Sequence, residues 1–178
     1  LGLFYGMGKA KLQAELGLST KQEAEKLFNQ YHERVPFVRD LMNETSRWAS
    51  REGEIRTLLG RGCRFNKWEP AQFGMHTPMT WEDAMKKYGE NRIRRAFTYK
   101  ALNKLIQGSA ADMTKKSMLD LYKEGIIAHI QIHDELDISV ESDKKAKRII
   151  EIMEAAVDLE VPNKVDYESG KTWGNIYD

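Results

Sequence analysis

The stretch that decides the fold is residues 127–140, which read IAHIQIHDELDISV. Apolar residues alternate on both sides of a polar centre, with Ile126, Ala128, Ile130 and Ile132 on one face before it and Leu136, Ile138 and Val140 on one face after it. A period of two is typical of half-buried strands. The stretch therefore predicts a β-hairpin that buries its flanks and exposes its turn.

The predicted turn carries His133, Asp134 and Glu135. Adjacent carboxylates repel each other, and proteins tolerate the repulsion mainly where a divalent cation or a positive partner neutralises it. The turn therefore indicates metal-dependent chemistry. A polar turn that happens to contain a histidine is the alternative, and a motif of three residues does not decide between the two.

Composition sets the broad class of the protein. The chain has 178 residues, of which 41% are hydrophobic and 31% charged, as expected of a folded domain with a core. No apolar run approaches the roughly 18 residues of a membrane helix, and the N-terminus lacks the order of a signal peptide. We expect a cytoplasmic protein without membrane contact. Cys63 is the only cysteine, which excludes an internal disulfide framework and a cysteine-rich zinc site.

The formal net charge of +1 hides an uneven distribution. Between Arg47 and Lys104 basic residues outnumber acidic ones, and the balance turns acidic past Asp120. The basic part could face phosphate groups. It could equally be a solvated surface, which charge alone favours because an asymmetry of this kind is only a prior.

Capping and periodicity predict the remaining elements. In chain order we expect a helix that starts before residue 1 and includes residues 9–16, a capped helix from Thr20 to near Pro36, a helix from there to about Arg51, and a hairpin over residues 55–65. An irregular segment over residues 66–80, a capped helix after Thr80, and a long helix over residues 91–122 follow. After the 127–140 hairpin come a helix from Ser142 to near Leu159 and a short strand and tail over residues 165–177.

Within the predicted long helix, Asn103, Gln107 and Ala111 share one face, beside small residues that permit close approach. Side-chain amides at this spacing suit hydrogen bonds to acceptors on the minor-groove edges of nucleic acid.

These features together resemble the C-terminal part of a family A DNA polymerase, the group of bacterial DNA polymerase I and many phage replicases. Five segments match in order. LGLFYGM (residues 1–7) resembles the second half of the fingers helix that closes over the incoming nucleotide, and residues 54–64 resemble the hairpin after the fingers helices. Residues 102–112 resemble the helix along the primer-template minor groove, residues 131–136 resemble motif C of the palm, and GKTW (residues 170–173) resembles the C-terminal ending. Ordered agreement of several motifs is far more specific than any one of them.

The resemblance implies an α+β fold, a partial right-hand polymerase with a helical fingers portion and a palm portion that contains the antiparallel motif C hairpin. It implies fingers over residues 1–91 and palm over residues 92–178. The palm sheet would then have an open edge beside the hairpin, because the family's motif A strand has no counterpart in this sequence.

For the chemistry, the resemblance implies that Asp134 and Glu135 hold catalytic Mg²⁺ while a primer 3′-hydroxyl attacks a deoxynucleoside triphosphate and releases pyrophosphate. His133 would lie against the primer backbone. Gln107 and Asn103 would contact the minor groove of the newest base pairs, whose acceptors are similar for every sequence.

The resemblance also implies roles in the first part of the chain. Tyr5 would stack over the template position with Gly6 giving it room, although a helix aromatic is otherwise more often packing. Leu1 stands where the family has an aromatic residue, which would alter how the sugar of the incoming nucleotide is sensed. Arg61 and Arg64 could steady phosphates or be exposed charges of a hairpin, and the sequence favours neither.

Two parts of the family's active site have no counterpart in this sequence. They are motif A, with the second metal-binding aspartate, and the arginine and lysine that grip the triphosphate; all would precede residue 1. We therefore expect the chain alone to be inactive and to act on primer-template DNA and deoxynucleoside triphosphates together with the upstream half of the same polymerase.

Three other functions compete with this interpretation. A single-subunit RNA polymerase fragment has a related palm, but Glu135 favours DNA synthesis because the RNA enzymes typically carry a small residue there. A non-catalytic DNA-binding remnant would keep the basic part and the amide stripe. A metal-dependent phosphohydrolase built on His133 and Asp134 would need further histidines, and the only others are His32, His76 and His129, without the spacing of a helical ligand pair.

Overall fold

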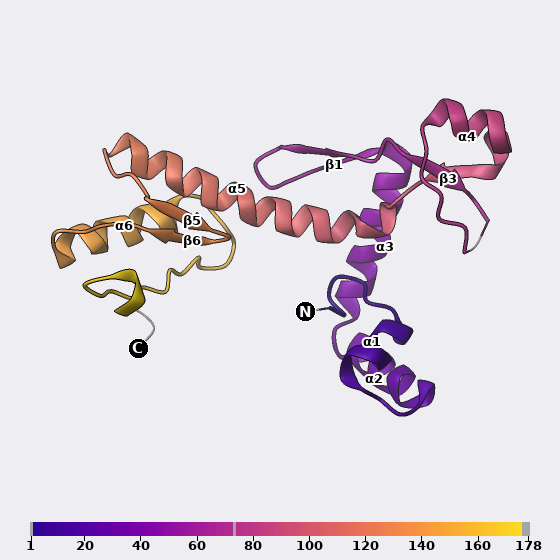
Figure 1. The fold of residues 1–178 in the computed structure, drawn as a ribbon, viewed down its shortest axis with the longest axis horizontal. Coiled ribbons are helices and arrows are strands. Elements are labelled where there is room, and N and C mark those ends of the chain that lie inside the picture. Colours follow the sequence, from indigo (N-terminus) through magenta and orange to yellow (C-terminus); the bar gives the residue numbers. More distant parts are fainter. Residues whose placement is uncertain (1, 73, 176–178) are drawn as a thin grey trace. The chain divides into compact units, whose positions relative to one another are not determined.

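A computed structural model describes residues 2–72 and 74–175. The chain divides into two compact units, Leu1–Gly108 and Ser109–Asp178, each of which is considered by itself. In Figure 1 the first unit runs from indigo to pink and the second from pink to yellow. The division lies inside helix α5 (Ala101–Lys123). This division reflects which residues pack together, and it does not test the predicted boundary between a fingers portion (residues 1–91) and a palm portion (residues 92–178), which stays a prediction.

The first unit opens with three helices, α1 (Lys9–Leu16), α2 (Lys21–Arg34) and α3 (Pro36–Glu52). The predicted capping box at the start of α2 is confirmed, because the Glu23 amide donates to the Thr20 hydroxyl and the Thr20 amide donates to the Glu23 carboxylate. The expectation of a helix that continues from residue 1 into α1 was wrong. Residues 2–6 form a hydrogen-bonded turn, and Gly6 adopts φ 85°, outside the range of a right-handed helix.

The predicted hairpin between α3 and the middle of the unit is confirmed. Strands β1 (Glu54–Arg56) and β2 (Gly62–Arg64) are antiparallel with Ile55 opposite Cys63. Ile55 packs in a buried cluster with Ala49, Phe65 and Ala101, which joins the hairpin to α3 and to the start of α5.

A second pair of strands was missed by the sequence. Strand β3 (Trp68–Pro70) pairs antiparallel with β4 (Ile93–Arg95), and α4 (Trp81–Tyr88) and the 3-10 turn η1 (Glu90–Arg92) lie between them. Residues 66–80 are therefore not wholly irregular. The long helix begins at Ala101 rather than near residue 91, after the turn η2 (Thr98–Lys100).

Two local features explain this difference. The buried Glu69 carboxylate, 5% exposed, accepts from the Arg94 guanidinium at 2.9 Å, so a charge pair holds β3 to β4. Phe97 adopts φ 64°, which breaks any right-handed helical path through residues 93–100. The predicted cap of α4 is confirmed, since the Thr80 hydroxyl accepts from the Asp83 amide.

The second unit contains the rest of α5, strands β5 (Ile130–Ile132) and β6 (Glu135–Asp137), helix α6 (Asp143–Ala155) and the turn η3 (Trp173–Asn175). Leu121 of α5, Ile126, and Ile149 and Ile152 of α6 form its core. Ser142 caps α6 as predicted, but the helix ends at Ala155 rather than near residue 159.

The expected strand near the C-terminus is absent from residues 165–175, the part of that segment which the structure describes. There the Val165 amide donates to the Glu154 carboxylate, 3.2 Å away, in place of a ladder of backbone bonds. Helices with three separate two-stranded antiparallel sheets confirm the α+β class over the described residues. Among these residues no helix has both the length and the apolar character needed to cross a bilayer.

The tip of the β1–β2 hairpin lies against the first turns of α5, and Gly108 makes the approach possible. The Arg61 guanidinium donates to the Gly108 carbonyl at 3.0 Å. A Cβ added at Gly108 would lie 2.8 Å from the Thr57 methyl carbon, which is shorter than a van der Waals contact. The Thr57 hydroxyl accepts from the Arg61 amide at 3.0 Å, so the loop is held from within as well.

We predict that Gly108→Ala destabilises the chain by about 1–2 kcal/mol. Overpacking typically costs about 1–3 kcal/mol, and alanine returns up to about 1 kcal/mol of helix propensity. Urea unfolding followed by tryptophan fluorescence measures the change. Thr57→Ser is the matched background, because it removes the methyl group and keeps the hydroxyl. In that background Gly108→Ala should be neutral or stabilising, and an equal loss in both backgrounds would contradict the steric explanation.

His32 is the one buried histidine among the described residues. His32, on α2, is 8% exposed, and its ring makes edge contacts with those of Phe28 and Tyr31 at centroid distances of 4.5 and 5.2 Å. Its Nδ1 atom has no hydrogen-bond partner within the described part of the chain. Burial lowers the pKa of His32 below its ordinary value of 6.5, and the positive charge of Arg39 lowers it further.

We predict that acid destabilises the chain through His32. The unfolded chain binds a proton at His32 near pH 6.5, but the folded chain resists it. The contribution of the neutral ring is therefore complete above that pH and is lost as the pH falls through the folded pKa. The loss of melting temperature between about pH 7.5 and about pH 5 should be smaller in His32→Leu than in the unsubstituted chain. His129→Gln, at an exposed position, is the control and should leave the loss unchanged.

Candidate active site

The hairpin of the second unit ends in a two-residue loop. Ile130 pairs with Asp137, Gln131 with Leu136, and Ile132 with Glu135, which leaves His133 and Asp134 between the strands. His133 adopts φ 54°, in the left-handed region. Histidine is one of the non-glycine residues found there more often than most. The Gln131 side-chain amide donates to the His133 carbonyl, so a side chain of the strand helps to hold the loop.

The register decides which side chains of the hairpin are buried. Cross-strand partners project on the same face, so Leu136 lies on one face and Glu135 on the other with Ile130 and Ile132. Leu136 packs against the core of the second unit, as do Ile138 and Val140 further along. Ile130 and Ile132 are 41% and 37% exposed. The expected burial was therefore confirmed for the outgoing side and for Ile126, and it was wrong for Ile130 and Ile132, whose side chains project from the opposite face of the hairpin.

The carboxylates of the turn are open to solvent. Asp134 is exposed and forms no hydrogen bond or ion pair with the rest of the described chain. Glu135, also exposed, begins β6. Nowhere in residues 2–72 and 74–175 do three or more potential ligands of the His, Cys, Asp and Glu types gather into a metal cluster. Mg²⁺ commonly takes only one or two carboxylates and completes its shell with water and substrate phosphates. Asp134 and Glu135 fit such a partial set of ligands.

The predicted amide stripe lies on α5 in the first unit. Gln107 is exposed and Asn103 is half-buried, one helical turn apart. Gln107 directly precedes Gly108, where the hairpin tip touches the helix. The structure thus brings these two amides onto one supported turn of helix.

The two hairpin arginines that the sequence singled out, Arg61 and Arg64, have partners within the first unit. Arg61 donates to the Gly108 carbonyl. Arg64 donates to Glu54 at 3.3 Å, although its side chain is 80% exposed. Arg61 therefore has a structural role whatever else it contacts, and Arg64 keeps most of its surface free for solvent or a ligand.

Near the N-terminus Tyr5 is half-buried, with its ring edge-to-face against Phe4 at 5.4 Å. Gly6 has a positive φ, and a Cβ there would lie 3.0 Å from the Met42 methyl carbon. Both conformation and space therefore favour glycine at that position. Leu1 lies outside the described residues.

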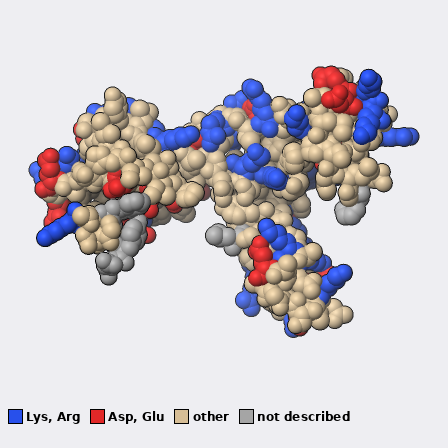
Figure 2. Space-filling view, in the orientation of Figure 1, with Lys and Arg blue, Asp and Glu red and all other residues tan. Residues whose placement is uncertain are grey.

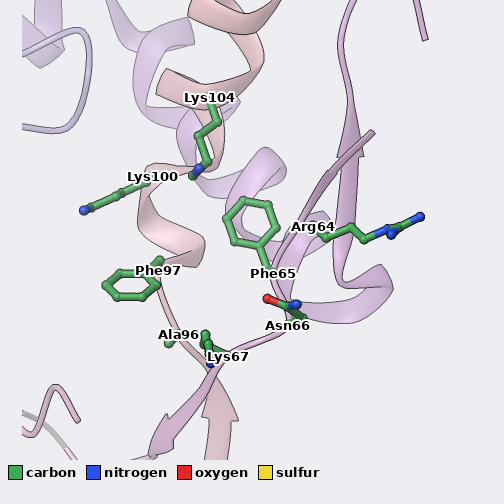
Figure 3. Close-up of a pocket in the computed structure, with 8 residues that line it drawn as sticks. All are labelled: Arg64, Phe65, Asn66, Lys67, Ala96, Phe97, Lys100 and Lys104. Atoms are coloured by element: carbon green, nitrogen blue, oxygen red, sulfur yellow. The ribbon is translucent and has the colours of Figure 1, made fainter. Parts of the chain in front are cut away.

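Sequence reasoning did not single out a group of three lysines, Lys67, Lys100 and Lys104, that lie around one pocket of the first unit (Figure 3). Their only signal in the sequence was the basic character of that part of the chain. In Figure 2 blue side chains also predominate over the hairpin β1–β2 and the start of α5.

Comparison with known proteins gives a consistent result. The family described as "DNA polymerase family A" matches residues 1–175. A DNA-directed DNA polymerase of Pseudomonas phage M6 is 32% identical over 98% of this chain and 28% of its own length. DNA polymerase I of Bacillus caldotenax is 33% identical over 97% of this chain and 18% of its own length.

A solved structure agrees with the sequence relatives. It is the POL domain of Pol1 from M. smegmatis in complex with a DNA primer-template and dNTP, with a TM-score of 0.75 and 27% identity over 99% of this chain. The match covers 30% of that chain. The mixed helices and small antiparallel sheets are thus those of part of a polymerase domain, and the chain spans less than a third of each of these proteins.

We predict that the two faces of the β5–β6 hairpin differ in their effect on stability. Leu136→Ala should cost about 1–3 kcal/mol, toward the low end of values for core leucines because Leu136 is half-buried. Ile132→Ala, on the exposed face at the last position of β5 before the loop, should cost less than about 1 kcal/mol. Urea unfolding followed by circular dichroism compares them. A larger loss for Ile132→Ala would contradict the register.

Proposed function

Because the chain belongs to DNA polymerase family A, we propose that it supplies the motif C hairpin and the minor-groove helix of a template-directed DNA polymerase. The observation that carries the proposal is the exposed Asp134–Glu135 pair at the end of a hairpin that Leu136 anchors in the core. The exposed Asp134 carboxylate, which has no partner in the described chain, is available for a cation, and the core-packed strand next to it limits its movement.

In this proposal Asp134, with Glu135 beside it, holds Mg²⁺ during two-metal phosphoryl transfer. Bound Mg²⁺ would supply activation of the primer 3′-hydroxyl and neutralisation of the charge on the leaving pyrophosphate. The protein would keep the two carboxylates in place, and both the short loop and the hydrogen bond from Gln131 restrict their movement. Since two carboxylates do not complete a two-metal cage, the upstream half of the polymerase would supply a further one. The chain alone would then be inactive.

The proposed substrates are primer-template DNA and deoxynucleoside triphosphates. The solved M. smegmatis structure is a complex with these two ligand classes. On this chain Gln107 and Asn103 would donate to minor-groove acceptors, which are similar for all base pairs. His133 would contact the primer backbone. Arg64 would contact phosphate through its exposed guanidinium, and Arg61 would contribute mainly by holding the hairpin on α5.

The same assignment proposes roles near the N-terminus. Tyr5 would stack over the template position and Gly6 would let the turn take its shape, while Leu1 would adjoin the sugar of the incoming nucleotide. Residues 1–91 would belong to the fingers and residues 92–178 to the palm. Bacterial and phage relatives favour the cytoplasm of a bacterium or of a phage-infected cell as the place of action.

A non-catalytic DNA-binding remnant is the second candidate. The observation that favours it is the lack of a three-ligand cluster over the described residues. It predicts DNA binding without any extension, whichever polypeptide is added.

We predict that primer extension requires both halves and Asp134. The chain should not extend a DNA primer on a template with Mg²⁺ and all four nucleotides. Extension should appear when a polypeptide with the upstream half of a related family A polymerase is added. Asp134→Asn should reduce the rate at least about 1000-fold, because a neutral amide is a much weaker Mg²⁺ ligand than a carboxylate.

The matched control is Asp158→Asn, which makes the same chemical change at an exposed position outside the hairpin and should leave the rate unchanged. Extension by the chain alone would overturn the proposed need for an upstream carboxylate. Full activity of Asp134→Asn in the mixture would overturn the proposed metal site.

A further inference from the structure

The first unit has a basic pocket whose three lysines have no role in the proposed function, and Arg64 is the one residue of the pocket that was assigned a phosphate contact above. Its volume is about 200 Å³. Arg64, Lys67, Lys100 and Lys104 line it, together with the rings of Phe65 and Phe97, and no carboxylate does. Figure 3 shows the Phe65 ring in the middle of the group, with Lys104 reaching toward it and Lys100 and Arg64 extending away on opposite sides.

The lysines of the pocket are not neutralised within the protein. Lys67, Lys100 and Lys104 form no ion pair with any carboxylate of the described residues, whereas Arg64 interacts with Glu54. Lys100, the last residue of η2, and Lys104, in the first turn of α5, are four residues apart, a spacing at which like charges on a helix repel. An anion bound between them would relieve that repulsion.

Aromatic rings accompany these charges. The Lys100 amino group lies 5.0 Å from the centroid of the Phe97 ring and 5.6 Å from that of Tyr99. Tyr99 is 61% exposed, so its ring can accept a stacked base. Phe97 reaches this place through a left-handed backbone, which is unfavourable for a bulky residue. Such strain persists where the surrounding structure imposes it, often at a ligand site.

We propose that this pocket binds the phosphate backbone of single-stranded DNA as the strand crosses the first unit. Cations beside exposed aromatic rings are the usual means of binding single strands without sequence preference. The pocket is smaller than the roughly 300–1,000 Å³ of sites that enclose small molecules, so it suits one phosphate of a passing strand better than an enclosed nucleotide. The inference rests on the proposed function for the identity of the nucleic acid, which would be the unpaired template strand.

The test is fluorescence anisotropy of a labelled oligothymidylate titrated with the full chain at several salt concentrations. The double substitution Lys100→Gln/Lys104→Gln should weaken binding about tenfold at low salt. It should also reduce the slope of log affinity against log salt by about 1.4, since each phosphate contact on a single strand contributes about 0.7. Glutamine keeps most of each side-chain stem, so packing is little disturbed.

The matched control is Lys21→Gln/Lys26→Gln, which removes two exposed lysines of α2 in the same unit. It should change the affinity less than about twofold. Equal weakening by the two double variants, or no weakening by either, would overturn the pocket. Displacement of the probe by dTTP at the same total phosphate concentration would also overturn it, because the site would then prefer a free nucleotide to a strand.

This test and the test of the proposed function can fail separately. Reconstituted extension without any single-strand binding by the chain would remove the pocket and leave the polymerase assignment standing. Selective loss of binding in Lys100→Gln/Lys104→Gln without extension in any mixture would keep the pocket and remove the catalytic proposal.

Discussion

The register of the β5–β6 hairpin is the constraint on which the candidate active site depends. With Ile132 opposite Glu135, Leu136 packs into the core and the Asp134–Glu135 pair stays in solvent. A slip of one residue would exchange the two faces of β6, so that Glu135 would enter the core and Leu136 would leave it. Moving a charged carboxylate from solvent into an apolar core costs far more free energy than exposing one leucine. The apolar contact that stabilises the second unit therefore also specifies which carboxylates a cation can reach.

In the first unit the position of the amide side chains depends on a glycine. Gly108 lets the β1–β2 hairpin approach α5 closely enough for Arg61 to bond its carbonyl, and the bond fixes the helix one residue beyond Gln107. A side chain that forms hydrogen bonds in the minor groove must be attached to a rigid backbone, because small displacements weaken the binding geometry. Of the small residues beside the amide stripe, Gly108 thus serves packing within the protein, and the Gln107 side chain that precedes it stays exposed.

Local patterns could be predicted from the sequence and distant pairings could not. Thr20 with Glu23, and Ser142, cap helices through contacts within three residues, and the sequence contains everything that decides them. Strands β3 and β4 depend instead on the bond between Glu69 and Arg94, 25 residues apart, and the apolar spacing after residue 93 continued a helical pattern. The exposure of Ile130 and Ile132 also escaped prediction, because alternation identifies a face without telling which face meets the core. The Asp134–Glu135 turn was found because its motif is short and contiguous.

The basic part of the chain shows why a count of charges does not locate a nucleic-acid site. Several of its arginines have their partners in the fold: Arg61 donates to the Gly108 carbonyl, Arg94 pairs with Glu69, and Arg95 donates to the carbonyls of Ser50 and Phe65. A planar guanidinium can serve several acceptors at once and remain charged, whereas an ammonium group is strongly hydrated and stays at the surface unless a specific anion replaces its water. Lys67, Lys100 and Lys104 follow the second pattern. Removal of Arg61, Arg94 or Arg95 would therefore act first on folding, and removal of a lysine from the pocket would act on the affinity for an anion.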